Sequence, residues 1–383
     1  NILLRNQLRF MSFYFNVIGI TSKDTKHFPE IIQREGIRLV SIKLTRSISL
    51  ITDLIALLKM IHIFVREKPQ IVHSHTPKAG LLAMLAARLV SVPVRLHTLS
   101  GLPLSEATGI RKRIFRVAER ITGSCAHRVY PNSAGLKRLV IEERLYSPDK
   151  LKIIGNGSSN GIDLEYFNSS NFDSTADFRK NFRSTIGISE DDIVFCFIGR
   201  IVKDKGIKEL IHSFHNLLIA NERNTKTLSR IVLLLVGPLG TGDNRIGKHL
   251  EHTIQTHSEI EYVGRKDDIR PYLLASDVFV FPSYREGFPN VVMQAGAMDL
   301  PCIVTDINGC NEIVVNMENG LIVQPKDIDS LSGAMQLLLD NPALRANMAS
   351  KARKMVADRY NQKDFWAALL EEYNDLLEAK EII

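Results

Sequence analysis

Cysteine is scarce in this sequence, and its few residues follow no metal-binding or disulfide spacing. The chain of 383 residues contains four cysteines, which lie at positions 125, 196, 302 and 310. No two of them form a C-x-x-C pair, the spacing typical of structural zinc sites and redox motifs. The sequence therefore indicates neither a zinc site nor a disulfide framework, and it predicts four reduced cysteines buried in hydrophobic cores.

The sequence also lacks an apolar run that could cross a membrane. The best candidate, residues 48–65, carries Asp53, Lys59 and His62 at positions that follow a helical pattern. A spanning helix needs about 20 consecutive, mostly apolar residues. We therefore expect an amphipathic helix that packs on a core. Because no signal peptide is visible either, the sequence predicts a cytoplasmic protein that is soluble or peripheral to the inner face of the cell membrane.

Acidic residues are few in the first part of the chain. Residues 1–165 hold 25 Lys and Arg against 12 Asp and Glu, whereas the remainder holds 24 against 30. Such an asymmetric balance indicates that the first part faces an anionic partner. Aromatic residues are not interleaved with the basic ones, as stacking on nucleic-acid bases prefers. A nucleic-acid partner is therefore not expected.

The basic residues concentrate in one helical pattern, residues 109–121. Apolar residues recur there at helical spacing, namely Ile110, Ile114, Val117 and Ile121. Basic residues occupy most other positions, and the predicted membrane contacts are Arg111, Lys112, Arg113 and Arg116, with Arg120 beyond them. Each basic residue near an anionic leaflet contributes about 1 kcal/mol, so this helix could hold the protein at a membrane. The alternative is a solvated basic face over an ordinary core stripe.

Short apolar runs alternate with helical patterns along the whole chain, which predicts parallel sheets covered by helices. The expected strands are 15–20, 38–42, 70–74, 94–98, 128–131, 152–154, 193–198, 230–236, 260–263, 278–281, 302–305 and 321–323. The expected helices are 27–35, 49–66, 79–90, 110–123, 133–143, 206–220, 268–275, 289–298, 328–340 and 342–357. The chain is long enough for two domains of ~190 residues, and the polar segment 168–185 is interpreted as their linker.

Residues 283–298 are the most informative stretch. They follow a buried-looking strand and turn through Gly287 into a helix that is expected to begin near Pro289, with Asn290 as a possible cap. The open amino end of such a helix binds anions through its free N–H groups. Glu286 stands just before it and could accept hydrogen bonds from sugar hydroxyls. This local chemistry suggests a nucleotide-sugar pocket.

Four stretches in order resemble retaining glycosyltransferases of family 4. Residues 283–298 resemble the E-x7-E region of that family, and 199–206 resemble its diphosphate-binding turn. Residues 72–80 resemble its turn in the first domain, and 96–101 contain what looks like its cleft histidine. The likeness covers nearly all of the chain. It implies the α/β GT-B fold, in which two Rossmann-like parallel-sheet domains face an interdomain cleft.

The resemblance implies domains at 1–167 and 186–361, with a helix at 362–383 returning to the first domain. The implied catalytic residues are His97, Glu286, Arg200 and Lys205. The implied donor site comprises Gly199, Arg200, Lys205, Gly237, Gly264, Arg265, Ile269, Glu286, Gly287, Phe288, Pro289, Asn290 and Gln294. His75 and Lys78 are expected on the acceptor side. Parallel sheets of this kind bind ligands beyond the carboxyl ends of their strands, where several of these residues lie.

Two features depart from the family pattern. Gln294 occupies the position of the second acid of the motif, which in the family is thought to hold the donor ribose, so we expect a weakened or altered ribose contact. The chain opens on a helical pattern, whereas relatives begin with a strand and a glycine-bearing loop, so we expect that first strand to be missing. A catalytically silent binding subunit therefore remains an alternative.

The resemblance implies a metal-independent transfer of an N-acetylhexosamine or hexose, with retention of configuration, from a UDP-sugar to a lipid-diphosphate-linked saccharide of capsular, O-antigen or N-glycan precursors. Arg200 and Lys205 would stabilise the leaving diphosphate in place of a metal. Asp327 and Asp329 follow Pro325 and open a helical pattern, so we interpret them as a cap rather than a metal site. The remaining alternative is a nucleotide-sugar epimerase of the same architecture.

Overall fold

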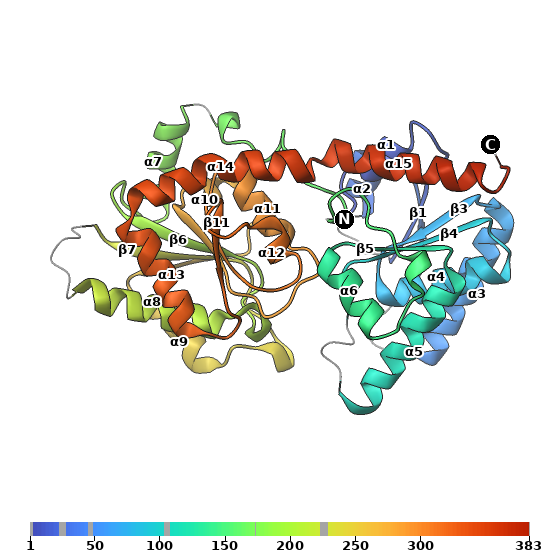
Figure 1. The fold of residues 1–383 in the computed structure, drawn as a ribbon, viewed down its shortest axis with the longest axis horizontal. Helices are drawn as coiled ribbons and strands as arrows, with labels where there is room; N and C mark the ends of the chain where they lie inside the picture. Colours follow the sequence, from blue (N-terminus) through green and yellow to red (C-terminus); the bar gives the residue numbers. More distant parts are fainter. Residues whose placement is uncertain are drawn as a thin grey trace. The chain divides into compact units, whose positions relative to one another are not determined.

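A computed structural model describes residues 3–22, 28–44, 49–102, 108–172, 174–222 and 229–382 (Figure 1). The chain divides into two compact units. Unit 1 comprises residues 1–161 together with 362–383, and unit 2 comprises residues 162–361. The first boundary therefore lies before the segment that the sequence suggested as a linker.

The linker prediction for residues 168–185 is wrong. Most of the segment is helix α7 (Thr175–Thr185), and it belongs to unit 2. Phe178 and Phe182 stack along one side of α7, and Phe182 meets Tyr272 edge-on with ring centres 5.0 Å apart. The buried guanidinium of Arg183 binds the Asp277 carboxylate at 2.8 Å. A few aromatic contacts and one buried cation thus bind a segment of polar composition to the second core.

Unit 2 is built on a sheet of six parallel strands. These are β6 (Ile193–Ile198), β7 (Ile231–Val236), β8 (Ile260–Gly264), β9 (Val278–Phe281), β10 (Cys302–Thr305) and β11 (Gly320–Val323). The order across the sheet is β11-β10-β9-β6-β7-β8, as in a doubly wound dinucleotide-binding fold. The strand order reverses between β6 and β9, and ligands of such sheets bind at this switch point, beyond the carboxyl ends of the strands.

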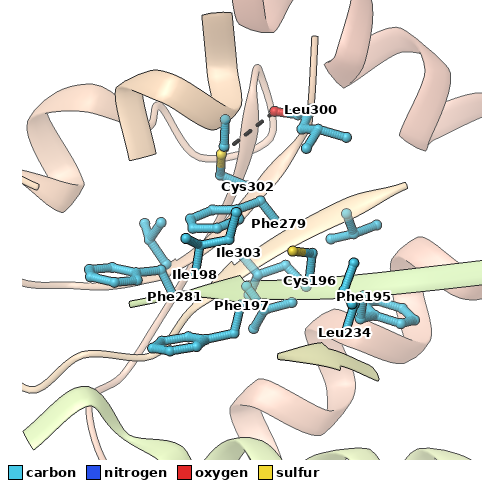
Figure 2. Close-up of a cluster of buried hydrophobic side chains, with 14 of the residues drawn as sticks. Phe195, Cys196, Phe197, Ile198, Leu234, Phe279, Phe281, Leu300, Cys302 and Ile303 are labelled. Atoms are coloured by element: carbon cyan, nitrogen blue, oxygen red, sulfur yellow. Dashed lines mark hydrogen bonds between the residues drawn. The ribbon is translucent and has the colours of Figure 1, made fainter. Parts of the chain in front are cut away.

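The core of unit 2 explains why its strands are nearly continuous apolar runs. Phe195 and Phe197 of β6 and Phe279 and Phe281 of β9 are fully buried, and they fill both faces of the sheet (Figure 2). Cys196 and Cys302 lie among the same side chains. All four cysteines are free and buried, which confirms the prediction from their spacing. Burial raises the pKa of the Cys196 thiol to about 12, so this thiol is unreactive.

Helices cover both faces of the unit 2 sheet, as crossover connections require. They are α8 (Ile207–Glu222), α9 (Lys248–Thr256), α10 (Arg270–Leu274), α11 (Asn290–Ala297), α12 (Cys310–Ile313), α13 (Ile328–Asp340) and α14 (Pro342–Tyr360). The sequence did not predict α9 or α12. Asp327 caps α13, since its carboxylate accepts a hydrogen bond of 3.0 Å from the backbone N–H of Ser330. This contact confirms the prediction that the aspartate is a cap.

Unit 1 carries two smaller parallel sheets. One pairs β1 (Ile18–Thr21) with β2 (Arg38–Ser41), and the other has the order β3-β4-β5, with β3 (Ile71–Ser74), β4 (Val94–Leu99) and β5 (Arg128–Pro131). The helices are α1 (Gln7–Met11), α2 (Phe28–Glu35), α3 (Leu50–Glu67), α4 (Pro77–Leu89), α5 (Gly109–Cys125) and α6 (Ala134–Glu142). The strand expected at 152–154 does not form. In its place, the single residue Leu151 makes an isolated bridge to Val129 of β5.

The last helix, α15 (Gln362–Glu378), packs on unit 1. Its Trp366 donates a hydrogen bond of 2.7 Å from Nε1 to Oδ1 of Asn160. Phe365, Trp366 and Leu369 share a core with Val94 and Leu96 of β4. The end of the chain therefore supports the sheet that carries the histidines described below.

None of the helices in the described residues is long and apolar enough to cross a membrane. Helix α3 packs on the core of unit 1, as expected for residues 48–65, but it is less amphipathic than the sequence indicated. Helix α3 buries Ala56, Met60 and Ile63, but its opposite side is also apolar and stands exposed, with Leu50 at 83 % and Leu54 at 56 %. The sequence reasoning assumed that apolar residues mark the buried side, and here they occupy both sides.

Candidate functional site

Glycines line the switch point of unit 2 because the backbone segments there approach too closely for a side chain. Gly237 follows β7 with φ +146°, and a Cβ on it would lie 1.8 Å from the carbonyl oxygen of Gly199. Gly206 has φ +69°, and its Cβ would lie 2.0 Å from the carbonyl oxygen of Pro282. The turns after β6, β7 and β9 are thus held in close contact. The predicted donor-site residue Gly237, together with Gly206 at the end of the predicted diphosphate-binding turn, makes this possible.

An ion pair stands at this switch point. The Nζ atom of Lys205 binds Oε1 of Glu286, and the two side chains are only 15 % and 17 % exposed. Ser283 donates a hydrogen bond of 2.8 Å to the same carboxylate oxygen. Lys205 Nζ also lies 5.0 Å from the centre of the Phe281 ring. Two predicted catalytic residues, from segments 81 positions apart, therefore meet in one cluster.

Arg200 and Gln294 complete the polar groups of this region. Arg200 follows β6, is exposed, and makes no hydrogen bond or ion pair with another described residue. Its guanidinium keeps five N–H donors available for a ligand. The side-chain amide of Gln294, on α11, is half-buried and likewise has no partner among the described residues. Both side chains can bind a ligand without breaking an existing contact.

The start of α11 differs in one detail from the prediction. Pro289 holds the N-cap position, and Asn290 is the first helical residue, so Asn290 does not cap the helix. No side chain satisfies the first N–H groups of this helix. Gly309 passes close by, since a Cβ on it would lie 2.6 Å from the carbonyl oxygen of Gly287. The turn 286–289, with the buried Phe288, is therefore fixed by backbone packing.

Sequence reasoning missed the residues that hold the two donor-site turns together. Asp204 accepts hydrogen bonds from Asn244 at 2.6 Å and from Arg285 at 3.2 Å. Tyr284 donates to the carboxylate of Glu209 at 2.5 Å. Burial raises the pKa of Tyr284, which keeps this hydroxyl protonated. Most of these residues lie inside or beside the quoted stretches, but nothing in their spacing indicated which would pair.

The segment after β8 holds the remaining predicted donor residues. Gly264 accepts a hydrogen bond of 2.9 Å at its carbonyl from the N–H of Gly237, which joins this segment to the switch point. The Arg265 side chain is 67 % exposed, and its Nη2 atom lies 3.6 Å from Oδ1 of Asp267. Ile269 packs its side chain against the core. Any contact of Ile269 with a nucleotide base would therefore come from its backbone.

Unit 1 has its own polar cluster at the carboxyl ends of β3 and β4. His97 is fully buried, and its Nδ1 shares a hydrogen bond of 2.8 Å with Oγ of Ser74. A Cβ on Gly80 of α4 would lie 2.4 Å from the His97 ring, so a glycine is required beside it. His73 shares hydrogen bonds with Tyr373 at 2.5 Å and with Thr98 at 2.7 Å. Sequence reasoning gave no indication that Tyr373, on α15, belongs to this cluster.

Two ring nitrogens of the cluster are left without a partner. Nδ1 of His75 and Nε2 of His97 are buried and make no hydrogen bond with another described residue. The His73 and His75 rings lie 4.2 Å apart. Burial lowers the pKa of His75 to about 3 and that of His97 to about 4, so both are neutral at pH 7. A neutral histidine can hydrogen-bond a substrate hydroxyl or phosphate without carrying charge.

Lys78 is less available than the sequence suggested. Its Nζ lies 2.6 Å from Oδ1 of Asp53, on the neighbouring helix α3. The cation predicted for an acceptor diphosphate therefore already has a counter-charge. Within the described residues, no group of three or more His, Cys, Asp and Glu side chains could hold a metal ion.

The basic helix α5 does not cover a core stripe. The four residues predicted as its apolar stripe are exposed: Ile110 at 75 %, Val117 at 55 %, Ile114 at 45 % and Ile121 at 36 %. The alternative of an ordinary core stripe is therefore wrong. Lys112 and Arg116 both lie within ion-pair distance of Glu143, whereas Arg111 and Arg113 have no such partner among the described residues. The exposed surface of α5 is thus both apolar and basic.

The chain forms two parallel-sheet α/β units, and the switch point of unit 2 carries cations, an acid and an open helix end. These are the parts expected of a glycosyltransferase of the GT-B fold. Residues 178–355 match the family described as Glycosyl transferases group 1, and residues 17–157 match Glycosyl transferase 4-like domain. The chain belongs to this glycosyltransferase family.

Relatives support the assignment over nearly the full length. The capsular polysaccharide biosynthesis glycosyltransferase CapM of Staphylococcus aureus is 34 % identical over 99 % of this chain and 95 % of its own. An Escherichia coli enzyme named UDP-Gal:alpha-D-GlcNAc-diphosphoundecaprenol alpha-1,3-galactosyltransferase is 30 % identical over 83 % of this chain and 78 % of its own. HepE of Anabaena, solved in complex with UDP, has the same fold, with a TM-score of 0.79 at 16 % identity over 98 % of this chain and 96 % of that chain.

Proposed function

We propose that this protein transfers a hexose or N-acetylhexosamine from a UDP-sugar to a lipid-diphosphate-linked saccharide, with retention of configuration and without a metal, in the synthesis of a surface polysaccharide. The observation that carries the proposal is the Lys205–Glu286 pair at the glycine-lined switch point of unit 2. The relatives from S. aureus and E. coli support the class of product and the kind of acceptor, by their names.

The cations at the switch point suit a leaving diphosphate. Cleavage of the sugar–phosphate bond places negative charge on the phosphate, and fixed cations in a dry site stabilise that charge. Arg200 offers a planar fork of donors, while Lys205 has three donors, only one of which is used by Glu286. The ion pair therefore holds Lys205 in place and leaves two of its N–H donors available for the diphosphate. Glu286 keeps its second oxygen for a sugar hydroxyl.

The proposed reaction needs no base from the protein. The acceptor hydroxyl attacks the anomeric carbon from the face that UDP leaves, so a carbon–oxygen bond forms as the sugar–phosphate bond breaks. The departing phosphate takes the proton of that hydroxyl. The neutral His97 of unit 1 offers its free Nε2 to a substrate hydroxyl. In unit 2, Gln294 accepts one hydrogen bond from the ribose in place of the usual carboxylate.

The donor class is tested by thermal unfolding with UDP, UDP-sugars, GDP and GDP-mannose, each in the presence of EDTA. A ligand at 100 times its Kd stabilises the folded state by about 2.7 kcal/mol. We expect this stabilisation, seen as a higher unfolding temperature, with uridine nucleotides alone. If none of these nucleotides raises the unfolding temperature, the proposed donor site is contradicted. Release of free sugar from a UDP-sugar without acceptor would indicate an epimerase, and binding without any turnover would indicate a silent subunit.

We further propose that α5 attaches the protein to the anionic inner face of the membrane. Changing Arg111, Lys112 and Arg113 to glutamine is expected to lower affinity for phosphatidylglycerol vesicles at low salt by about 10²-fold, because each basic residue contributes about 1 kcal/mol. Affinity for UDP should not change. The control removes the same charge from unit 2, with Lys180, Lys351 and Lys354 changed to glutamine. Equal vesicle binding by both variants would refute the role of α5.

A further inference from the structure

Ser74 lies beside His97 on the neighbouring strand of the unit 1 sheet. The two residues stand directly opposite each other, Ser74 at the end of β3 and His97 on β4. Both are buried, with Ser74 at 6 % exposure and His97 at 0 %. The Ser74 oxygen lies 2.8 Å from Nδ1 of His97 and 3.3 Å from the carbonyl oxygen of Leu96. One hydroxyl therefore contacts both a ring nitrogen and a backbone acceptor.

The Ser74 hydroxyl has a single hydrogen for these two neighbours. A carbonyl oxygen can only accept, so the contact with Leu96 uses the hydrogen of Ser74. The other contact, with Nδ1 of His97, is then made by a lone pair of the Ser74 oxygen. A lone pair needs a donor opposite it, so Nδ1 of His97 carries the ring proton.

The other ring nitrogen of His97 supports the same assignment. Nε2 is buried and has no partner among the described residues. A buried N–H without a partner is rarer in proteins than a buried acceptor without one, which favours a bare Nε2. Burial lowers the pKa of His97 to about 4, and a hydrogen bond with the backbone of Ser74 opposes that effect, as donation by the ring does. Since Nε2 has no partner, the donating nitrogen is Nδ1.

We propose that Ser74 is a positioning residue that holds His97 as the tautomer with its proton on Nδ1, so that Nε2 acts only as a hydrogen-bond acceptor. The substrate group at Nε2 must then be a donor, which is a sugar hydroxyl or an amide N–H. Phosphate oxygens are acceptors, so a diphosphate is excluded from this nitrogen. The proposal rests on the function proposed above, and it names the chemical group that unit 1 recognises at His97.

NMR of the protein with isotope-labelled histidine nitrogens measures the tautomer directly. A bare ring nitrogen and a protonated one resonate at well separated positions, and couplings to the ring protons distinguish Nδ1 from Nε2. The signals of His97 are assigned by their loss in a His97→Gln variant. We expect a protonated Nδ1 and a bare Nε2. A proton on Nε2 in the wild-type protein would overturn the proposal, whether or not any Ser74 variant folds.

Removal of the Ser74 hydroxyl is expected to release the tautomer. In Ser74→Ala, a population of His97 with its proton on Nε2 should appear. The value of kcat/KM for sugar transfer should fall by about tenfold, which is the effect of losing one hydrogen bond. Ser74→Thr returns a hydroxyl and should restore both the tautomer and the rate. A lower rate in Ser74→Ala with an unchanged tautomer would show that the serine supports only the packing of the strand.

Two controls remove other buried hydroxyls. Ser213 of α8 donates a hydrogen bond of 2.9 Å to the carbonyl oxygen of Ile328, so Ser213→Ala removes a comparable bond from unit 2. Tyr373→Phe removes the hydroxyl that contacts His73 in the same cluster. Both variants should keep the His97 tautomer, and Ser213→Ala should also keep the wild-type kcat/KM. A change of tautomer in either control would show that loosening of the fold, and no single serine, decides the position of the proton.

Fluorinated substrates test which group His97 recognises. Fluorine in place of a hydroxyl removes the hydrogen-bond donor, and an ester oxygen does the same for an acetamido N–H. These changes are made one at a time in the UDP-sugar and in a synthetic lipid-diphosphate acceptor. At the position that contacts Nε2, kcat/KM should fall about tenfold or more in the wild type and much less in His97→Ala. Equal losses in both proteins at every position would refute recognition of a donor group by His97.

Failure of the proposed transfer would give a different pattern. The tautomer is measured in the free protein, so absence of stabilisation by UDP would contradict the donor site of unit 2 and leave the assignment of His97 standing. Conversely, a protein that binds UDP and transfers sugar but carries the His97 proton on Nε2 would refute the role of Ser74 alone.

Discussion

Replacing Glu286 with glutamine is expected to lower kcat/KM for sugar transfer by about 10²-fold or more, equivalent to ~2.7 kcal/mol of transition-state stabilisation. Glutamine keeps the shape of the side chain but removes the charge that holds Lys205. The change would therefore weaken both roles proposed for this pair, the contact with the sugar and the placement of the cation beside the diphosphate. The measurement is initial-rate kinetics with the UDP-sugar identified by thermal shift.

A double-mutant cycle tests whether the two residues act as one unit. Lys205→Met should lower kcat/KM by a similar factor, and the double variant should lose much less than the product of the two effects. The control is Glu251→Gln, which breaks the Arg245–Glu251 ion pair elsewhere in unit 2. We expect normal kinetics from that variant. Independent, multiplicative losses would show that the ion pair has no role in placing Lys205.

The positions of the polar residues at the switch point of unit 2 could be predicted, because these residues directly follow the ends of strands. The apolar runs of β6 and β9 are short and bounded by glycine or proline, so the positions of Arg200 and Glu286 beyond them could be inferred from sequence. What could not be inferred is the pairing of Lys205 with Glu286, since it depends on how two turns far apart in the chain approach each other. That approach is set by Gly206 and its contact with Pro282, which no local pattern records.

The errors have a common physical cause, which is that composition does not reveal tertiary partners. Residues 168–185 look like a linker because they are polar, yet Phe178, Phe182 and Arg183 bind them to a core. Helix α3 looks amphipathic because charges interrupt it, yet Asp53 is used to pair with Lys78 of α4. The exposed side of α3 therefore carries large apolar residues beside Lys59 and His62, and only the structure shows which side that is.

Acidification from pH 7 to pH 5 is expected to lower the free energy of unfolding by about 4 kcal/mol through His75 and His97 alone, about 2 kcal/mol each. Both are neutral when folded, with pKa values of about 3 and about 4, whereas an unfolded histidine has a pKa near 6.5. As the pH falls below 6.5, the unfolded chain gains protons that the folded chain does not bind. The stability that is present above pH 6.5 is thus lost progressively toward about pH 4 for His97 and about pH 3 for His75.

Urea unfolding at a series of pH values measures this loss. His97→Asn should reduce the loss of stability between pH 7 and pH 5 by about 2 kcal/mol, because it removes one of several histidines whose pKa burial lowers. The substitution His212→Gln, on the exposed side of α8, is the control. If the asparagine variant fails to fold, the ring of His97 can be titrated directly by NMR in the wild-type protein, and a pKa near 6.5 would contradict the prediction. The same burial that makes the fold acid-labile keeps the free Nε2 of His97 uncharged at neutral pH.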